Sequence, residues 1–124
     1  MAITLSAAIR NARLDAIEST IGTSAILRIR SGAPPATVAT ASSGTVLATC
    51  TLPSDWLAAA SAGSKAKAGT WEDTSADATG TAGHFEIVAS DGTTVGMRGT
   101  AATSAADMIL DSTSFTAGQA FTHR

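Results

Sequence analysis

Large apolar side chains are scarce in this 124-residue sequence, and tyrosine is absent. Leu, Ile, Val and Phe together make up 22 residues, whereas alanine alone makes up 27. Such a low share of large apolar residues is typical of disordered chains when the net charge is high. The formal net charge here is only −2, so we expect an ordered domain with a thin core. A domain of this kind gains burial by associating with copies of itself or with a partner.

Cysteine is almost absent, and neither sign of charge dominates. The single Cys50 rules out an intrachain disulfide, and its apolar, threonine-rich surroundings predict a buried, inert thiol. Eight basic and ten acidic residues give no electrostatic footprint for nucleic acid or an anionic membrane. No run approaches the roughly 20 apolar residues of a membrane span, and the first residues carry charges that a signal peptide lacks. We expect a soluble protein made in a cytoplasm, with no nucleic-acid or membrane partner.

Motifs that carry chemistry are missing as well. The sequence contains no G-x-S-x-G, no phosphate-binding loop and no EF-hand spacing. His84 and Glu86 would share one strand face, but a metal site needs a third ligand, so a solvated face is the expectation. Glu72, Asp73 and Asp77 allow a weak calcium site, although a solvated acidic loop is the simpler interpretation. We therefore expect no enzyme activity, no cofactor and no bound metal.

The first recognisable element is a helix over residues 6–21. Leu14, Ile17 and Ile21 recur at helical spacing, and Ile9 widens the apolar stripe that they form. Capping residues stand at both ends of the helix. The stripe is narrow, and an isolated helix of this length is marginally stable. The helix must therefore dock, either on its own β domain or on a neighbouring subunit.

From residue 23 onward the pattern favours strands. Apolar and polar residues alternate over 25–30 and 45–52, and 83–99 is typical of a hairpin that turns at Asp91-Gly92. Weaker strands are expected within 65–73, 108–110 and 119–123. Between the strands we expect an extended proline-containing loop (31–44), one or two helical turns (54–64) and polar loops (73–82 and 100–106).

Six or seven short strands of this kind predict a mainly β fold. The expected architecture is an antiparallel β-sandwich or barrel with an N-terminal α-helix. We divide the chain into an N-terminal docking helix, residues 1–22, and a β-sandwich or barrel domain, residues 23–124. Trp56 and Trp71 are either the bulk of a thin core or anchors for a sugar or a partner. The candidate interface residues are therefore Ile9, Leu14, Ile17, Ile21, Trp56 and Trp71.

Four segments carry a resemblance to a known group of proteins. They are MAITLSAAIRNARLDAIESTIGTSAILRIRSG, TVLATCTLPSDWLAAA, GTWEDTSADATGTAGHFEI and DSTSFTAGQAFT. Together they span most of the chain and resemble a family of small proteins from tailed phages and prophages, described as phage structural proteins. The resemblance implies a virion setting without assigning a part of the virion, and it implies no catalytic or ligand residues.

These observations predict a non-enzymatic virion structural protein, made in the host cytoplasm. The specific expectation is a capsid decoration (cement) protein that stabilises the shell through oligomeric contacts. Its partners would be copies of itself, in a homo-oligomer such as a trimer, and the major capsid protein. The alternatives are a tail or baseplate component bound to tail proteins, a glycan- or receptor-binding module on the particle, and a cell-wall enzyme with a cleft at His84 or the acidic loop.

Overall fold

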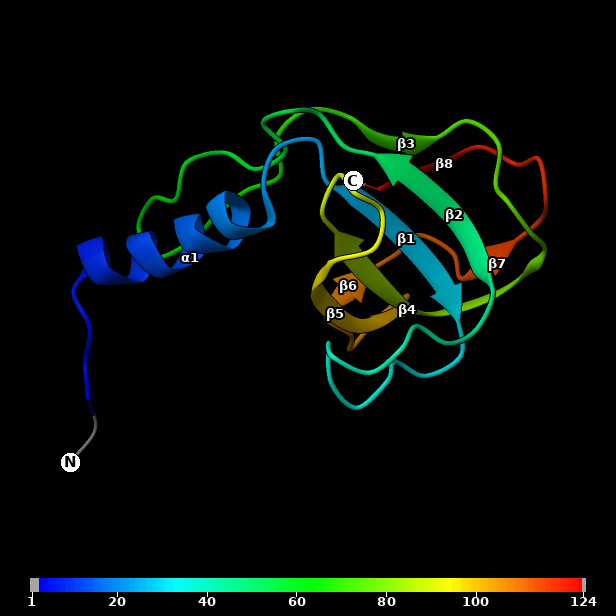
Figure 1. Cartoon of the computed structure of the whole chain (residues 1–124), viewed down its shortest axis with the longest axis horizontal. Helices are drawn as coiled ribbons and strands as arrows, with labels where there is room; N and C mark the ends of the chain where they lie inside the picture. Colours follow the sequence, from blue (N-terminus) through cyan, green and yellow to red (C-terminus); the bar gives the residue numbers. More distant parts are fainter. Residues whose placement is uncertain (1–2, 124) are drawn as a thin grey trace.

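The computed structural model describes residues 3–123, which form a mainly β fold with one N-terminal helix (Figure 1). The elements are α1 (Ala7–Ile21), β1 (Ile26–Ser31), β2 (Val46–Thr51), β3 (Trp71–Asp73), β4 (Gly80–Val88), β5 (Val95–Ala102), β6 (Met108–Ile109), β7 (Ser114–Phe115) and β8 (Phe121–His123). The expected fold class is confirmed. The described residues contain eight strands rather than six or seven, because two-residue strands such as β7 are too short for an alternation pattern.

Six strands form one sheet and the remaining two form a second, smaller one. The large sheet has the order β2-β1-β4-β5-β6, with β7 paired to β4, and the small sheet consists of β3 and β8. All the pairings are antiparallel except that of β5 with β6, which is parallel. The expectation of a purely antiparallel arrangement is therefore wrong at β6. The large sheet does not close on itself, so the fold resembles a sandwich and not a barrel.

The hydrophobic core lies on one face of the large sheet. Paired residues on neighbouring strands contribute to it together: Leu27 of β1 lies between Cys50 of β2 and Ile87 of β4. Its buried members come from both sheets and the loops between them, and they include Trp56, Trp71, Phe85 and Phe115. Burial raises the pKa of the Cys50 thiol to about 12. The prediction that this thiol is buried is therefore confirmed.

The opposite face of the large sheet holds a carboxylate among three guanidinium groups. Glu86 on β4 is fully buried and forms ion pairs of 2.8 Å with Arg30 and 3.2 Å with Arg98. Arg28 lies 3.9 Å from the same carboxylate. Burial opposes the ionised form, but the Ser42 hydroxyl and the guanidinium groups outweigh it and lower the pKa of Glu86. An internal charged cluster therefore replaces an apolar layer on this face.

The loop of residues 32–44 covers this charged cluster. Three carbonyl oxygens of the loop accept hydrogen bonds from Nη1 of Arg98: those of Thr37 (2.9 Å), Val38 (3.3 Å) and Thr40 (2.6 Å). Nδ1 of His84 lies 2.9 Å from the carbonyl oxygen of Gly32, and the His84 side chain is fully buried. The expectation that His84 and Glu86 lie on a solvated strand face is therefore wrong, because the loop closes over them.

Residues 56–68 form an extended two-stranded projection, which we call the arm. Isolated bridges join Leu57 to Lys67 and Ser61 to Ser64, and Ala62 and Gly63 take positive φ values of 51° and 75° at its tip. The helical turns expected over 54–64 are therefore absent. The alanine-rich sequence favours a helix locally. In the structure, however, backbone N–H groups of the arm donate hydrogen bonds to side chains of α1.

The outer edge of β2 is closed by two acidic residues. The Thr49 N–H donates a hydrogen bond of 2.9 Å to Oδ2 of Asp73, and the Asp77 N–H donates one of 2.8 Å to the carbonyl oxygen of Leu47. The Thr49 hydroxyl also donates to Asp77, at 2.7 Å. These contacts satisfy backbone groups that an edge strand otherwise leaves open to another chain.

Candidate interaction surface on the N-terminal helix

Helix α1 extends away from the sheets, and the arm lies beside it (Figure 1). The Ser6 hydroxyl accepts a hydrogen bond of 3.3 Å from the Ile9 N–H and caps the first turn. Gly22, at φ +98°, ends the helix, and its N–H donates to the carbonyl oxygen of Glu18 at 2.8 Å. Trp56 Nε1 donates to the Gly22 carbonyl oxygen at 2.9 Å, so the core holds the C-terminal end of α1.

The arm is attached to α1 through polar side chains of the helix. Three of these side chains, spaced four and three residues apart, lie on one side of the helix and accept hydrogen bonds from backbone N–H groups of the arm. The pairs are Asn11 with Gly63 (2.9 Å), Asp15 with Ala60 (2.9 Å) and Glu18 with Leu57 (3.2 Å). The helix therefore docks on its own chain through its polar side and through Ile21, the residue of the apolar stripe that packs against the core.

Lys65 of the arm strengthens this attachment. Its ammonium group lies 2.6 Å from Asp15 and 3.2 Å from Glu18, and its side chain is nearly buried between them. The hydrogen bond from Lys65 lowers the pKa of Asp15, and the same contact raises the pKa of Lys65. Burial opposes ionisation of Glu18, but the Leu57 N–H and Lys65 outweigh it and lower its pKa. Both carboxylates are therefore held in their charged form.

Substituting Lys65 by methionine should loosen the arm without unfolding the sheets. The change leaves Asp15 and Glu18 together without their cation, so backbone amides of the arm should exchange hydrogen about tenfold faster. Mass spectrometry of amide exchange measures this effect at Leu57, Ala60 and Gly63.

A matched control comes from the same arm. Lys67 lies over the Trp71 ring and donates to the Gly69 carbonyl oxygen, so Lys67→Met should leave exchange at the helix contacts unchanged. Equal rates in the two variants would contradict the assigned role of Lys65. In the wild type, the attachment should hold at neutral pH and weaken as the pH falls through the lowered pKa values of Asp15 and Glu18.

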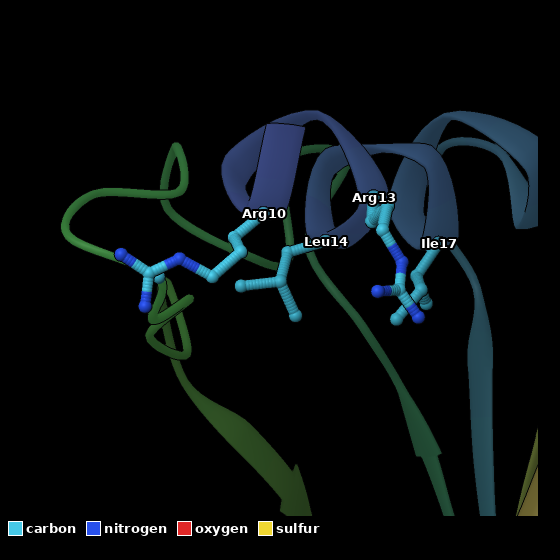
Figure 2. A pocket seen from close by; sticks show the side chains of 5 residues that line it. Arg10, Arg13, Leu14 and Ile17 are labelled. Atoms are coloured by element: carbon cyan, nitrogen blue, oxygen red, sulfur yellow. The ribbon is translucent and has the colours of Figure 1, made fainter. Parts of the chain in front are cut away.

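The apolar stripe lies on the side of α1 next to these polar contacts, and Gly63 of the arm both binds Asn11 and borders the stripe. Figure 2 shows Arg13, Leu14 and Ile17 pointing from the helix toward the same side, with Arg10 reaching toward the arm. These four residues and Gly63 line a hollow of about 460 Å³. Leu14 and Ile17 are only partly buried, so the stripe is accessible from solvent.

A second hollow, of about 580 Å³, lies between the helix and β5. Arg13 and Ile17 line both hollows, and we call the two hollows together the helix groove. Ile21, Val95 and Met97 contribute apolar surface at its β5 end. Ile21 also packs against the core, which fixes the groove relative to the sheets.

The groove carries positive charge on an apolar floor. Arg10 and Arg13 form no ion pair with any carboxylate of residues 3–123. The acidic residues of the same helix, Asp15 and Glu18, are engaged with Lys65 on the arm side. The groove therefore suits an occupant that is both apolar and acidic.

The structure separates the six candidate interface residues into two groups. Leu14, Ile17 and Ile21 line the groove, and Ile9 is 50% exposed on the same helix. Trp56 and Trp71 are 1% and 5% exposed in the core, with ring centroids 6.0 Å apart. Neither indole is a surface anchor in this chain, and the core interpretation of the two tryptophans is the one that holds.

The sequence offered five side chains for metal binding: Glu72, Asp73, Asp77, His84 and Glu86. Asp73 and Asp77 accept hydrogen bonds from Thr49. Within residues 3–123, no three His, Cys, Asp or Glu side chains gather closely enough to hold a metal ion. The same part of the chain contains no helix with the length and apolarity needed to cross a bilayer.

The sequence did contain a signal for the polar attachment of α1. Asn11, Asp15 and Glu18 recur at helical spacing, as the apolar stripe does, and so define a second functional side. The partner of that side could not be found from the sequence, because the arm was expected to be helical.

Comparison with known proteins adds no relative. No family model, no curated protein and no solved structure matches this chain.

Proposed function

We propose that this protein is a non-enzymatic structural subunit of a phage virion, and specifically a capsid decoration protein that stabilises the shell through contacts between many copies. The observation that carries the proposal is the attachment of α1. Its polar side is bound to the arm, while its apolar stripe and two arginines line an open groove. The resemblance to phage structural proteins supplies the virion setting.

The physical argument concerns what the helix leaves uncovered. A surface helix normally buries its apolar stripe against its own domain. Here none of the residues of α1 is fully buried, and Ile3, Leu5 and Ile9 at its N-terminal end are also exposed. Exposed apolar surface with a charged rim is typical of a contact site for another protein. The interior of the fold, with its indole pair and internal charged cluster, serves to hold this surface rigidly.

A tail or baseplate location is the second candidate, because the same groove suits a tail protein equally well. Copy number distinguishes the two locations. A glycan-binding module has less support, because the two tryptophans that would stack on a sugar lie in the core.

Quantitative mass spectrometry of purified particles tests the proposal. A decoration protein should be present at hundreds of copies per particle, and Ile17→Asp should remove it from the particles, because a charge in a desolvated groove is unfavourable. Val38→Asp is the matched control, since Val38 is exposed but lies on the loop of residues 32–44. Both variants should fold, as judged by circular dichroism. A few copies per particle would indicate the tail, and absence from particles would refute a virion role.

A further inference from the structure

The β6 edge of the large sheet presents a short surface strip that is both apolar and acidic. Asp107, Ile109 and Asp111 alternate along the extended segment and are exposed, whereas Met108 and Leu110 between them are buried. Ile109 is 51% exposed and supplies the apolar surface of the strip. The Thr100 N–H and hydroxyl donate to Asp107 at 3.0 and 3.2 Å and fix the start of the strip.

This strip and the helix groove are complementary in chemistry and in length. The groove presents Arg10 and Arg13 beside an apolar floor, and the strip presents two carboxylates beside an apolar side chain. The four residue-to-residue steps from Asp107 to Asp111 span about 13 Å of extended chain. The seven steps from Arg10 to Ile17 rise about 10 Å along the helix. One strip therefore has the length to lie along one groove.

In this structure the strip lies outside the groove of its own chain. Gly96 lines the groove at the start of β5, whereas Ala101 and Ala102 at its end pair with β6. None of the three exposed residues of the strip lines either hollow of the groove. A contact between the strip and the groove must therefore join two copies.

Pairing of two grooves across a two-fold axis is disfavoured by charge. Such a pair would bring together four guanidinium groups, two Arg10 and two Arg13, none of which has an ion-pair partner among the described residues. Like charges brought together in an interface oppose binding. The strip, by contrast, brings carboxylates to the same guanidinium groups.

We propose that copies of this chain associate head to tail, with the strip Asp107–Ile109–Asp111 of one copy docked in the helix groove of the next. The inference rests on the proposed function only in requiring that copies touch one another. Head-to-tail contacts close into rings when the rotation between copies permits and otherwise extend into filaments. Each copy then places its strip in the groove of one neighbour and receives the strip of another neighbour in its own groove. This is the geometry that a cyclic oligomer requires.

Cysteine cross-linking between two single variants tests the direction of the contact. Leu14→Cys and Ile109→Cys should form mixed dimers when equal amounts are oxidised together, in excess over either homodimer. The native Cys50 is buried and its pKa is about 12, so it does not compete. Val38→Cys, at a comparably exposed apolar position, gives the background rate. Mixed dimers at the background rate, or a dominant Leu14→Cys homodimer, would overturn the proposal.

Sedimentation velocity of the unmodified protein supplies a second, independent measurement. The wild type should form oligomers, and Arg13→Glu and Ile109→Lys should each shift it toward the single-copy species by at least tenfold in dissociation constant. A wild type that stays single at about 1 mM would also overturn the contact. Both experiments use purified chain alone. Absence of the protein from particles would therefore refute the virion role and leave this contact standing. A purified chain that does not associate would refute this contact and leave the virion role standing.

Discussion

Replacing Glu86 by glutamine is expected to lower the free energy of unfolding by about 3–5 kcal/mol, because it removes one partner of a buried ion pair. The carboxylate is fully buried among Arg28, Arg30 and Arg98, and the variant would leave three cations without a counter-charge. It would also weaken the attachment of the loop of residues 32–44, whose carbonyl oxygens accept hydrogen bonds from Arg98. Urea denaturation followed by tryptophan fluorescence measures the loss, since both indoles lie in the core.

The pH dependence of stability distinguishes the effect of losing the Glu86 charge from the effect of changing the shape of the side chain. The pKa of Glu86 is lowered in the folded protein, so its contribution is present above the ordinary value of 4.5 and is lost as the pH falls through the folded value. The difference between wild type and variant should therefore shrink in acid. Glu72→Gln, at an exposed position, should change stability by less than about 0.5 kcal/mol. A similarly small effect at Glu86 would show that the cluster does not stabilise the fold.

Trp56→Ala is expected to have an effect of similar size, by a different mechanism. The change leaves a cavity in a core with few large side chains, which typically lowers the free energy of unfolding by about 3–5 kcal/mol. It also removes the ring contact with Trp71 and the hydrogen bond to the Gly22 carbonyl oxygen. Chemical denaturation measures the first effect, and amide exchange in α1 measures the second.

Trp56→Phe separates these two contributions. Phenylalanine keeps much of the apolar volume but cannot donate a hydrogen bond, so the Gly22 carbonyl oxygen loses its partner. The expected loss is about 1–3 kcal/mol, with faster amide exchange in the last turn of α1 relative to the sheets. Uniform exchange throughout the chain would argue that Trp56 supports only the core and does not hold the helix.

The elements that could be predicted from sequence are those whose partners lie nearby in the chain. Helix α1 has Ser6 and Gly22 at its ends, and the β4–β5 hairpin turns at Asp91-Gly92, where Asp91 accepts hydrogen bonds from Thr93 and Thr94. Capping and turn residues act within a few positions, so local chemistry is sufficient to find them.

The elements that were missed depend on distant segments. Polar residues at Glu86 and His84 indicate a solvated face when only strand alternation is considered, and nothing local reveals that residues 32–44 cover them. The arm was expected to be helical because alanine favours helices, yet its backbone N–H groups bind Asn11, Asp15 and Glu18 more than 35 residues away. Tertiary contacts override local preference in both cases.

The candidate site was predicted in part. The stripe of Leu14, Ile17 and Ile21 is present and accessible. The charges beside it gained meaning only from the structure, which shows that Glu18 binds the arm. Because Glu18 is bound to the arm, the charge of the groove comes from Arg10 and Arg13.

The closed outer edge of β2 limits how the sheets of two chains can pair. Exposed strand edges invite polymerisation into cross-β aggregates. Asp73 and Asp77 seal one margin of the large sheet, and at the other the terminal strand, β6, is only two residues long. Backbone pairing between the sheets of two chains is thereby discouraged.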